Sequence, residues 1–380
     1  MSDAPPSLRA RLVELAALFL RLGVTAFGGP AAHIAMMEDE VVARRQWLTR
    51  AEFLDLLGAT NLIPGPNSTE MAIHVGHRRA GWAGLVVAGC AFIVPSALLV
   101  TALAWAYMRW GALPRSVALL DGVKPVVVAI VVQALWRLGR AVLHNWLDAS
   151  VAVGAVAASL AGLHELAILA LAGLVVALVR ARPKPTAALI LPFGGLVPAA
   201  AATSAAGAGL LPLFLVFLKI GSVLFGSGYV LLAFLRSDLV ERYHWLTNDQ
   251  LLDAISVGQL TPGPVSTTAT FIGWMLHGAP GALVATVAMF LPAFIFVALS
   301  GPLVPRLRRS PLFGGILDGV NVASLALMAT VSWQLGRAAV TSWWTAALVA
   351  ASLLVLLRTR INSMWLILGG AAAGTLARLF

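Results

Sequence analysis

Long apolar segments separated by short polar turns follow one another along almost the whole chain. Residues 85–108 and 282–304 are two examples, and neither contains a charged side chain. A helix needs about 20 apolar residues to cross the hydrocarbon core of a bilayer. The pattern therefore predicts an all-α polytopic membrane protein with about 10–13 transmembrane segments.

Two nearly identical motifs interrupt this apolar pattern. Residues 61–69 read NLIPGPNST, and residues 259–267 read QLTPGPVST. A Pro-Gly-Pro triplet cannot continue a helix, because its two ring nitrogens carry no N–H and glycine does not restrain the backbone. Broken backbone at membrane depth is tolerated only where protein or a water-filled cavity surrounds it. We therefore expect a broken helix at each motif, and the pair of breaks indicates a transport site.

The two motifs belong to a tandem duplication. Sliding the sequence by 198 positions places Phe19 on Phe217 and the first Pro-Gly-Pro triplet on the second. A shift of 197 then matches two later Asp-Gly-Val stretches, 121–123 and 318–320. These co-linear matches predict three parts: a first repeat at 1–184, a connecting segment at 185–209 and a second repeat at 210–380. Prolines and glycines interrupt the connecting segment, so whether it crosses the membrane is left open.

The loop charges predict how the repeats are oriented. Lys and Arg gather at 78–79, 137–140 and 180–184 in the first repeat, but at 306–309 and 358–360 in the second. Cytoplasmic loops are enriched in these residues. Because equivalent loops carry the opposite bias, the halves are predicted to be inverted-topology repeats with a site near the bilayer midplane.

Each Pro-Gly-Pro segment has two possible paths. It could re-enter the membrane, leaving five crossings in each half, or span it, giving six with the connecting segment as a thirteenth. Three arginines within 38–50 favour the cytoplasm for that stretch, and hence the re-entrant form.

Composition narrows the classes of protein that remain. The chain is 60% hydrophobic and 11% charged, and its net charge of +10 comes mainly from arginines at the ends of apolar segments. This placement is a topology signal and gives no reason to expect a nucleic acid. Cys90 is a single cysteine and the seven histidines show no ligand spacing, so no disulfide, metal or other cofactor is expected. Residues 1–11 lack the design of a signal peptide and are expected to be retained.

Both breaks predict binding of an anion. Hydroxyl or amide residues follow each triplet, and a half-helix that begins there presents free backbone N–H groups and the positive end of its dipole. The Phe-Gly-Gly-Pro and Phe-Gly-Ser-Gly stretches allow equally close approach to the backbone. The alternative is that the prolines only kink their helices. The candidate binding residues are Gly28, Gly29, Pro30, Asn61, Pro64, Gly65, Pro66, Asn67, Ser68, Gly226, Ser227, Gln259, Pro262, Gly263, Pro264, Ser266 and Thr267.

Two cations are further candidates for the binding site. Arg21 and Lys219 are equivalent in the repeat, and each lies within apolar sequence. A basic side chain at the centre of a membrane helix costs about 2.5–3.5 kcal/mol on insertion scales. A buried oxyanion between the two side chains would offset this cost, because a desolvated anion needs compensating charge. The alternative is that each side chain extends to a nearby interface.

Proton coupling has five candidate residues: Asp55, Asp253, Asp121, Asp318 and Lys124. The first two precede the breaks and could instead be interfacial helix-start residues. Lys124 lies three positions after Asp121, so the two can pair on one helix face, and a structural ion pair is the alternative for that lysine.

Other acidic residues receive less weight. The acids at 38–40, Asp238 and Glu241 lie in amphipathic stretches and are expected to be solvated. Glu70 follows the first break but has no acidic counterpart in the second repeat.

Several of these motifs resemble the chromate ion transporter family in its long form, in which two homologous halves are fused. They are Phe-Gly-Gly-Pro at 27–30, Glu-Asp-Glu-Val-Val at 38–42, Trp-Leu-Thr at 47–49, Asp55, and Pro-Gly-Pro-Asn-Ser at 64–68. The resemblance implies thirteen spans in oppositely oriented halves. It also implies a multi-pass protein of the bacterial inner membrane that confers chromate resistance by exporting chromate with the proton-motive force. Ser227, Gly228 and Gln259 depart from the first copy, so the two halves of the site need not be equivalent.

The predicted function is therefore secondary active transport of a tetrahedral oxyanion, with chromate efflux in exchange for protons as the leading form. Sulfate has the same charge and shape, so a sulfate or other oxyanion permease is the alternative. An intramembrane enzyme is a remote alternative, because the histidines and aspartates form no catalytic or metal-binding set. The expected partners are the oxyanion, protons and the lipid bilayer, and a homodimer is left open.

Overall fold

The computed structural model describes residues 7–111, 113–180, 209–225, 230–308, 310–359 and 361–377, and these contain only helices and turns. The first repeat comprises α1 (Leu8–Thr25), α2 (Gly29–Glu38), the π-helix η1 (Asp39–Arg44), α3 (Arg50–Thr60), α4 (Asn67–Trp110), α5 (Pro114–Val142), α6 (Trp146–Leu160) and α7 (Glu165–Arg180). The second comprises α8 (Leu210–Val223), α9 (Leu231–Leu235), the π-helix η4 (Arg236–Arg242), α10 (Asn248–Leu260), the 3₁₀ turn η5 (Val265–Thr267), α11 (Thr268–Arg308), α12 (Pro311–Ala339), α13 (Trp343–Arg358) and α14 (Ser363–Ala377). The connecting segment lies outside the described residues except at its last position.

The order of elements is the same in both halves, down to the π-helix and one sharp bend. α4 bends at Ala80–Gly81 and α11 bends at the equivalent His277–Gly278, and both glycines have a φ of +61°. Each bend folds its helix into a hairpin whose arms touch through glycine. A Cβ atom on Gly84 would lie 2.1 Å from the carbonyl oxygen of Gly76, so only glycine permits this approach.

The first Pro-Gly-Pro break lies at the tip of a second hairpin, formed by α3 and the first arm of α4. Glu52, at the start of α3, pairs with Arg78, at the end of that arm, with 3.0 Å between the charged atoms. The two helices therefore run antiparallel, as a re-entrant segment requires. α3 has 11 residues and is about 16 Å long, roughly half the thickness of a bilayer core.

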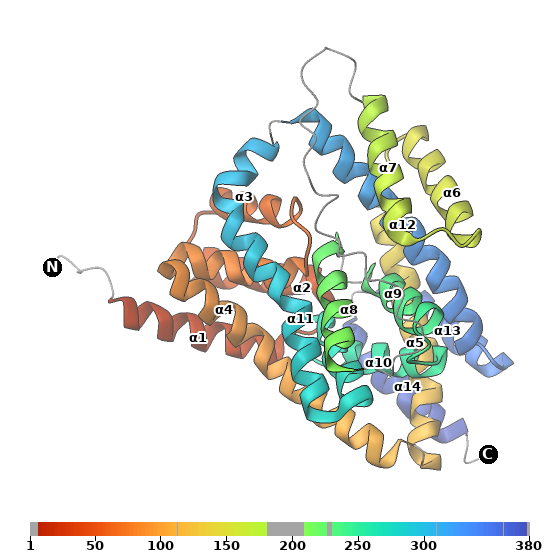
Figure 1. The fold of residues 1–380 in the computed structure, drawn as a ribbon. Coiled ribbons are helices and arrows are strands. Elements are labelled where there is room, and N and C mark those ends of the chain that lie inside the picture. Colours follow the sequence, from red (N-terminus) through yellow and green to blue (C-terminus); the bar gives the residue numbers. More distant parts are fainter. Residues whose placement is uncertain are drawn as a thin grey trace.

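The repeats exchange helices with one another. α5 of the first half packs on α14 of the second, and α12 of the second packs on α7 of the first (Figure 1). Small residues bring the backbones together at equivalent points. A Cβ atom on Gly122 would lie 2.0 Å from the Gly370 oxygen, and one on Gly319 would lie 2.2 Å from the Ala172 oxygen.

Membrane insertion of this bundle is supported by its longest helices. In the described part of the chain, four helices are long and apolar enough to cross a membrane: Asn67–Trp110, Ser116–Val142, Val265–Ser300 and Leu312–Ala339. Four shorter apolar helices accompany them. The all-α polytopic fold is therefore confirmed, whereas the expected number of crossings stays a prediction.

Candidate functional site

Each Pro-Gly-Pro break contacts the opposite repeat. The backbone N–H of Gly65, in the first triplet, donates to the carbonyl oxygen of Leu224 at 2.7 Å. At the equivalent position, the N–H of Gly263 donates to the carbonyl of Ala26 at 2.9 Å. Each triplet therefore docks on the end of the first helix of the opposite repeat, α8 or α1. This reciprocal pair of hydrogen bonds joins the break of each half to the other half.

The second break is more completely buried than the first. Gly263 has a φ of +86°, and a Cβ atom there would lie 2.8 Å from the Cβ of Ser96. The hydroxyl groups of Ser96 and Thr267 hydrogen-bond at 3.0 Å. Residues Gln259, Thr261, Ser266 and Thr267 are all buried. This half of the predicted site is thus occupied by protein.

A cavity of about 930 Å³ lies beside the first break and is lined by both repeats. Gly28, Pro30, Asn61 and Asn67 are the predicted site residues that line it. Further polar lining comes from residues of α5, α12 and the α13–α14 turn: Gln133, Arg137, Asn321, Ser324, Asn362 and Ser363. Phe225 and Val230 also line it and flank Gly226 and Ser227, which lie outside the described residues.

Arg137 on α5 is the one charged side chain among the described residues that line this cavity. The side chain is exposed, and no acidic group of the described chain pairs with it. The sequence analysis missed this residue because Arg137 fits the topology signal of its loop. Comparison of the repeats carries the overlooked signal: the second repeat has Gln334 at the position equivalent to Arg137, whereas the nearby Arg140 is repeated as Arg337.

Polar groups near the break have spare hydrogen-bonding capacity. The Asn67 side-chain nitrogen donates to the Asn61 oxygen at 2.9 Å, but the Asn67 side-chain oxygen is buried without a partner. The hydroxyl of Ser324 is likewise buried without a partner in the described chain. Unpaired buried polar groups are rare, and a bound polar ligand is one explanation for them.

Arg21 and Lys219 are placed differently from the expectation that an anion lies between them. Arg21 pairs with Glu40 at 2.6 Å, and Lys219 pairs with the equivalent Asp238 at 2.5 Å. Neither cation is among the described residues that line the cavity. The expectation that Glu40 and Asp238 are solvated is wrong, because their side chains are only 9% and 2% exposed. Each acid offsets the charge of its partner within the fold.

This pairing predicts a stability effect in the second repeat. Replacing Lys219 by methionine leaves Asp238 buried and uncompensated, which costs about 3–5 kcal/mol. We expect Lys219→Met to lower the melting temperature of the purified protein and Lys219→Met/Asp238→Asn to recover most of the loss. Equal melting temperatures of the single and double variants, or a melting temperature of the single variant equal to that of the parent protein, would exclude a structural role for the pair.

The proton-coupling candidates are dispersed. Asp253 and Lys124 come together across the repeats, with 3.1 Å between charged atoms, and the Tyr107 hydroxyl donates to the same carboxylate at 2.8 Å. Asp318 pairs with Arg180, which also binds the buried Asp148.

Asp55 and Asp121 lie apart from the candidate cavity. Asp55 on α3 is exposed, and Asp121 on α5 is half-buried. Neither residue lines the cavity beside the first break.

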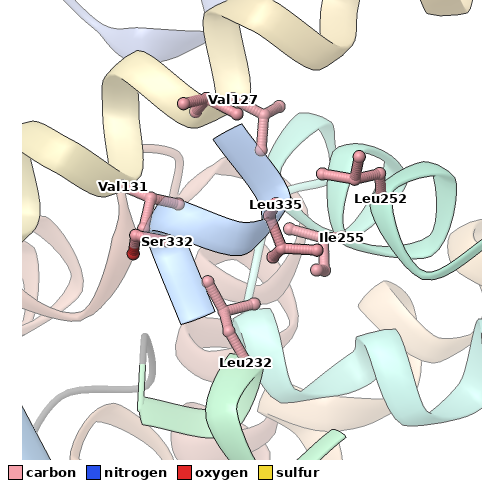
Figure 2. A pocket seen from close by; sticks show the side chains of 8 residues that line it. Val127, Val131, Leu232, Leu252, Ile255, Ser332 and Leu335 are labelled. Atoms are coloured by element: carbon pink, nitrogen blue, oxygen red, sulfur yellow. The ribbon is translucent and has the colours of Figure 1, made fainter. Parts of the chain in front are cut away.

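A second, small cavity lies between α5, α9, α10 and α12 (Figure 2). Its lining is aliphatic except for Ser332, whose hydroxyl donates to the carbonyl of Met328 at 2.6 Å. Leu252 and Ile255 of α10 face Val127 and Val131 of α5 across it (Figure 2). A lining without free donors or cations cannot compensate a desolvated anion, so this cavity is excluded as the anion site.

Comparison with known proteins decides the family. The profile of the chromate transporter family matches residues 13–178 and again residues 211–375. The chain is 34% identical over 375 residues to the chromate transport protein of Cupriavidus metallidurans, covering 95% of this chain and 92% of that one. It is 32% identical over 340 residues to the chromate transport protein of Pseudomonas aeruginosa, covering 85% and 81%. The chain belongs to the chromate transporter family.

Membership of the chromate transporter family confirms the resemblance carried by the motifs. Together with the apolar helices, it identifies a multi-pass protein of the bacterial inner membrane that is a transporter and not an enzyme. A shorter relative, the uncharacterized transporter YwrA of Bacillus subtilis, is 33% identical over 121 residues, which are 32% of this chain and 68% of that one. No solved structure matches the chain significantly.

Proposed function

We propose that this chain exports chromate from the cytoplasm and that the cargo binds in the cavity beside the first break. The observation that carries the proposal is the lining of that cavity: one unpaired cation, Arg137, with amide and hydroxyl groups and no carboxylate among the described lining residues. Chromate is a tetrahedral dianion. Relatives named as chromate transport proteins align with this chain over most of its length.

The polar lining matches the needs of a tetrahedral oxyanion. A guanidinium group donates two hydrogen bonds in a fixed fork, which suits two oxygens of one anion. The side-chain nitrogens of Asn67 and Gln133 each use one N–H on a protein acceptor, the Asn61 oxygen and the Leu356 carbonyl, and each has a second N–H that could donate to the anion. Ser324 adds a hydroxyl that has no partner in the described chain. Desolvating a dianion is costly without such compensation.

The position of the cavity supports loading from the cytoplasm. Arg137 and Ala141 lie near the C-terminal end of α5, and Ile361 and Asn362 lie in the α13–α14 turn. The positive-inside rule assigns both of these places to the cytoplasmic side. A cavity lined from that side takes up a cytoplasmic anion, as efflux requires.

Inverted repeats would supply the movement. The closeness of Gly89 on α4 to Phe294 on α11, together with clustering of Leu85 and Val297, supports an antiparallel arrangement of these equivalent helices. Reciprocal docking of Gly65 and Gly263 supports a two-fold relation at the centre. Rocking of one repeat against the other would then expose the site alternately to the two sides.

The proposal includes protons as the coupling ion. It leaves open whether the transporter forms a homodimer. The remaining candidates near the first break, Gly29, Pro64, Pro66 and Ser68, would shape the backbone donors rather than line the cavity. Sulfate permeation is the alternative cargo hypothesis, because sulfate shares the charge and the shape of chromate.

Flux measurements test the proposal. Everted membrane vesicles that contain the protein present its cytoplasmic face outward, so export appears as uptake of radiolabelled chromate. We expect uptake that rises with an imposed inside-acid pH gradient and that is absent from vesicles without the protein. Equal inhibition by unlabelled chromate and sulfate would favour the permease alternative. Absence of chromate uptake under every gradient would contradict the function.

A further inference from the structure

A stripe of polar side chains leads from the cavity along the first arm of α4. Asn67, Glu70, His74 and Arg78 recur at intervals of three or four residues and therefore share one helix face. Asn67 lines the cavity, and Arg78 pairs with Glu52 at the opposite end of the arm. The stripe thus connects the candidate binding site with the end of the hairpin that carries the topology arginines.

Glu70 is the exceptional member of this stripe. Its side chain is fully buried, with an exposed fraction of 0%, and neither carboxyl oxygen has a hydrogen-bond partner in the described chain. His74, one turn further on, is 7% exposed and its Nε2 atom is also without a partner. An isolated carboxylate cannot remain ionised in such surroundings, so the buried group is the neutral acid.

In the part of the chain that the structure describes, no charged group pairs with the Glu70 carboxyl. The titratable side chains on the neighbouring helices have other contacts or are exposed: Glu14 binds Arg79, Glu52 binds Arg78, His33 contacts Phe92 edge to face, and Asp55 is exposed. Arg21 on α1 binds Glu40, and His277 on α11 lies at the bend of its own hairpin. None of these groups hydrogen-bonds to either oxygen of the Glu70 carboxyl.

The neutral carboxyl packs directly on the docked break. Gly65 has a φ of +148°, and a Cβ atom there would lie 2.3 Å from Oε1 of Glu70. In this docked arrangement the N–H of Gly65 is used by the Leu224 carbonyl. If Glu70 lost its proton, the carboxylate could not stay in this buried position beside Gly65. Its departure would free the first break from its contact with Leu224. The Gly65 N–H would then be free to donate to an anion.

We propose that Glu70 is the proton-carrying group of the transporter and that its proton and the oxyanion exclude one another at the first break. The protonated acid holds Gly65 docked on Leu224, whereas binding of the oxyanion requires the undocked break and so expels the proton. The proton leaves the Glu70 carboxyl along the stripe by way of His74, and Glu70 becomes a carboxylate. This inference rests on the proposed function and supplies its coupling step.

Proton release on binding tests this exclusion. Chromate is added to the purified protein in weakly buffered detergent solution, and the released protons are followed with a pH indicator. The wild type is expected to release about one proton per bound chromate. Its affinity for chromate should therefore rise about tenfold per pH unit over the range in which Glu70 is protonated in the free protein. Glu70→Gln keeps the shape of the neutral acid and should release none, with an affinity that follows only the protonation of chromate itself.

Glu52→Gln provides a matched control. Glu52 is a carboxyl of the same hairpin at its outer end, and the second repeat has Gln250 there in an equivalent capping box. This variant should release protons as the wild type does. A difference infrared spectrum of the wild type against Glu70→Gln should show, at neutral pH, the C=O band of one protonated carboxylic acid.

The outcomes separate the two proposals. Chromate binding by the wild type without proton release, or equal release by Glu70→Gln, overturns the role of Glu70 and leaves chromate transport intact. Absence of the infrared band overturns it as well. A wild type that binds no chromate overturns the proposed function and the coupling step with it.

Discussion

Replacing Arg137 by glutamine is expected to lower the affinity for chromate by roughly ten- to hundredfold and to reduce flux accordingly. Arg137 is the one cation among the described residues of the cavity lining. A hydrogen bond to a charged group contributes about 1.5–3 kcal/mol, which corresponds to that range of affinity. Glutamine is the residue that the second repeat carries at this position, as Gln334, so the helix accommodates it. Chromate binding to purified protein and flux in proteoliposomes measure the effect.

Arg140→Gln is the matched control for this variant. Arg140 follows one turn later on α5, is repeated as Arg337 and does not line the cavity. The Arg140→Gln substitution removes the same charge from the same end of α5, so any change in membrane orientation would affect both variants. An equal loss of chromate binding in the two variants, or no loss in Arg137→Gln, would contradict the assignment of Arg137 to the binding site.

Substituting Gly263 by alanine is expected to abolish transport and to destabilise the protein. The added Cβ would lie 2.8 Å from the Cβ of Ser96 and 3.1 Å from the carbonyl oxygen of Gly23, at a φ of +86° that alanine rarely adopts. Overpacking costs about 1–3 kcal/mol, and unfavourable backbone geometry adds a similar amount. The triplet would be pushed away from Ala26, and one of the two reciprocal hydrogen bonds would be lost. Thermal unfolding and chromate flux report the two effects.

Gly154→Ala on α6 is the control for the alanine substitution. No atom lies within 4 Å of a Cβ at this position, so alanine should be neutral or raise stability by about 0.5–1 kcal/mol. If Gly263→Ala retained full stability and flux, reciprocal docking of the breaks would not be needed for transport.

The backbone of the site could be predicted from the sequence because its cause is local. A Pro-Gly-Pro triplet interrupts a helix because two of its three residues lack an N–H and the third does not restrain the backbone, so both triplets and the duplication were visible in the residue pattern. The arginines beside α3 favoured a re-entrant path, which stays a prediction with which the pairing of Glu52 and Arg78 is consistent. What each triplet docks on was not predictable, because the carbonyls of Ala26 and Leu224 carry no side-chain signature.

The side chains of the site were harder to assign, because their roles depend on tertiary partners. Arg21 and Lys219 had the pattern of anion ligands, yet the fold places Glu40 and Asp238 against them. Arg137 was concealed by the positive-inside rule, since one arginine can set topology and line a cavity at once. Glu70 was given little weight for lacking an acidic counterpart, although the asymmetry agrees with a cavity beside the first break and with the burial of the residues of the second.

The exchange of helices between the repeats has a consequence for shorter members of the family. A polypeptide with only one repeat would leave bare the faces of α5 and α7 that α14 and α12 cover in this chain. A second subunit would restore the close glycine-mediated packing that α14 and α12 provide here, so half-length relatives are expected to work as pairs. Fusion of the two repeats fixes their ratio at one to one and makes their pairing in the bilayer an intramolecular step.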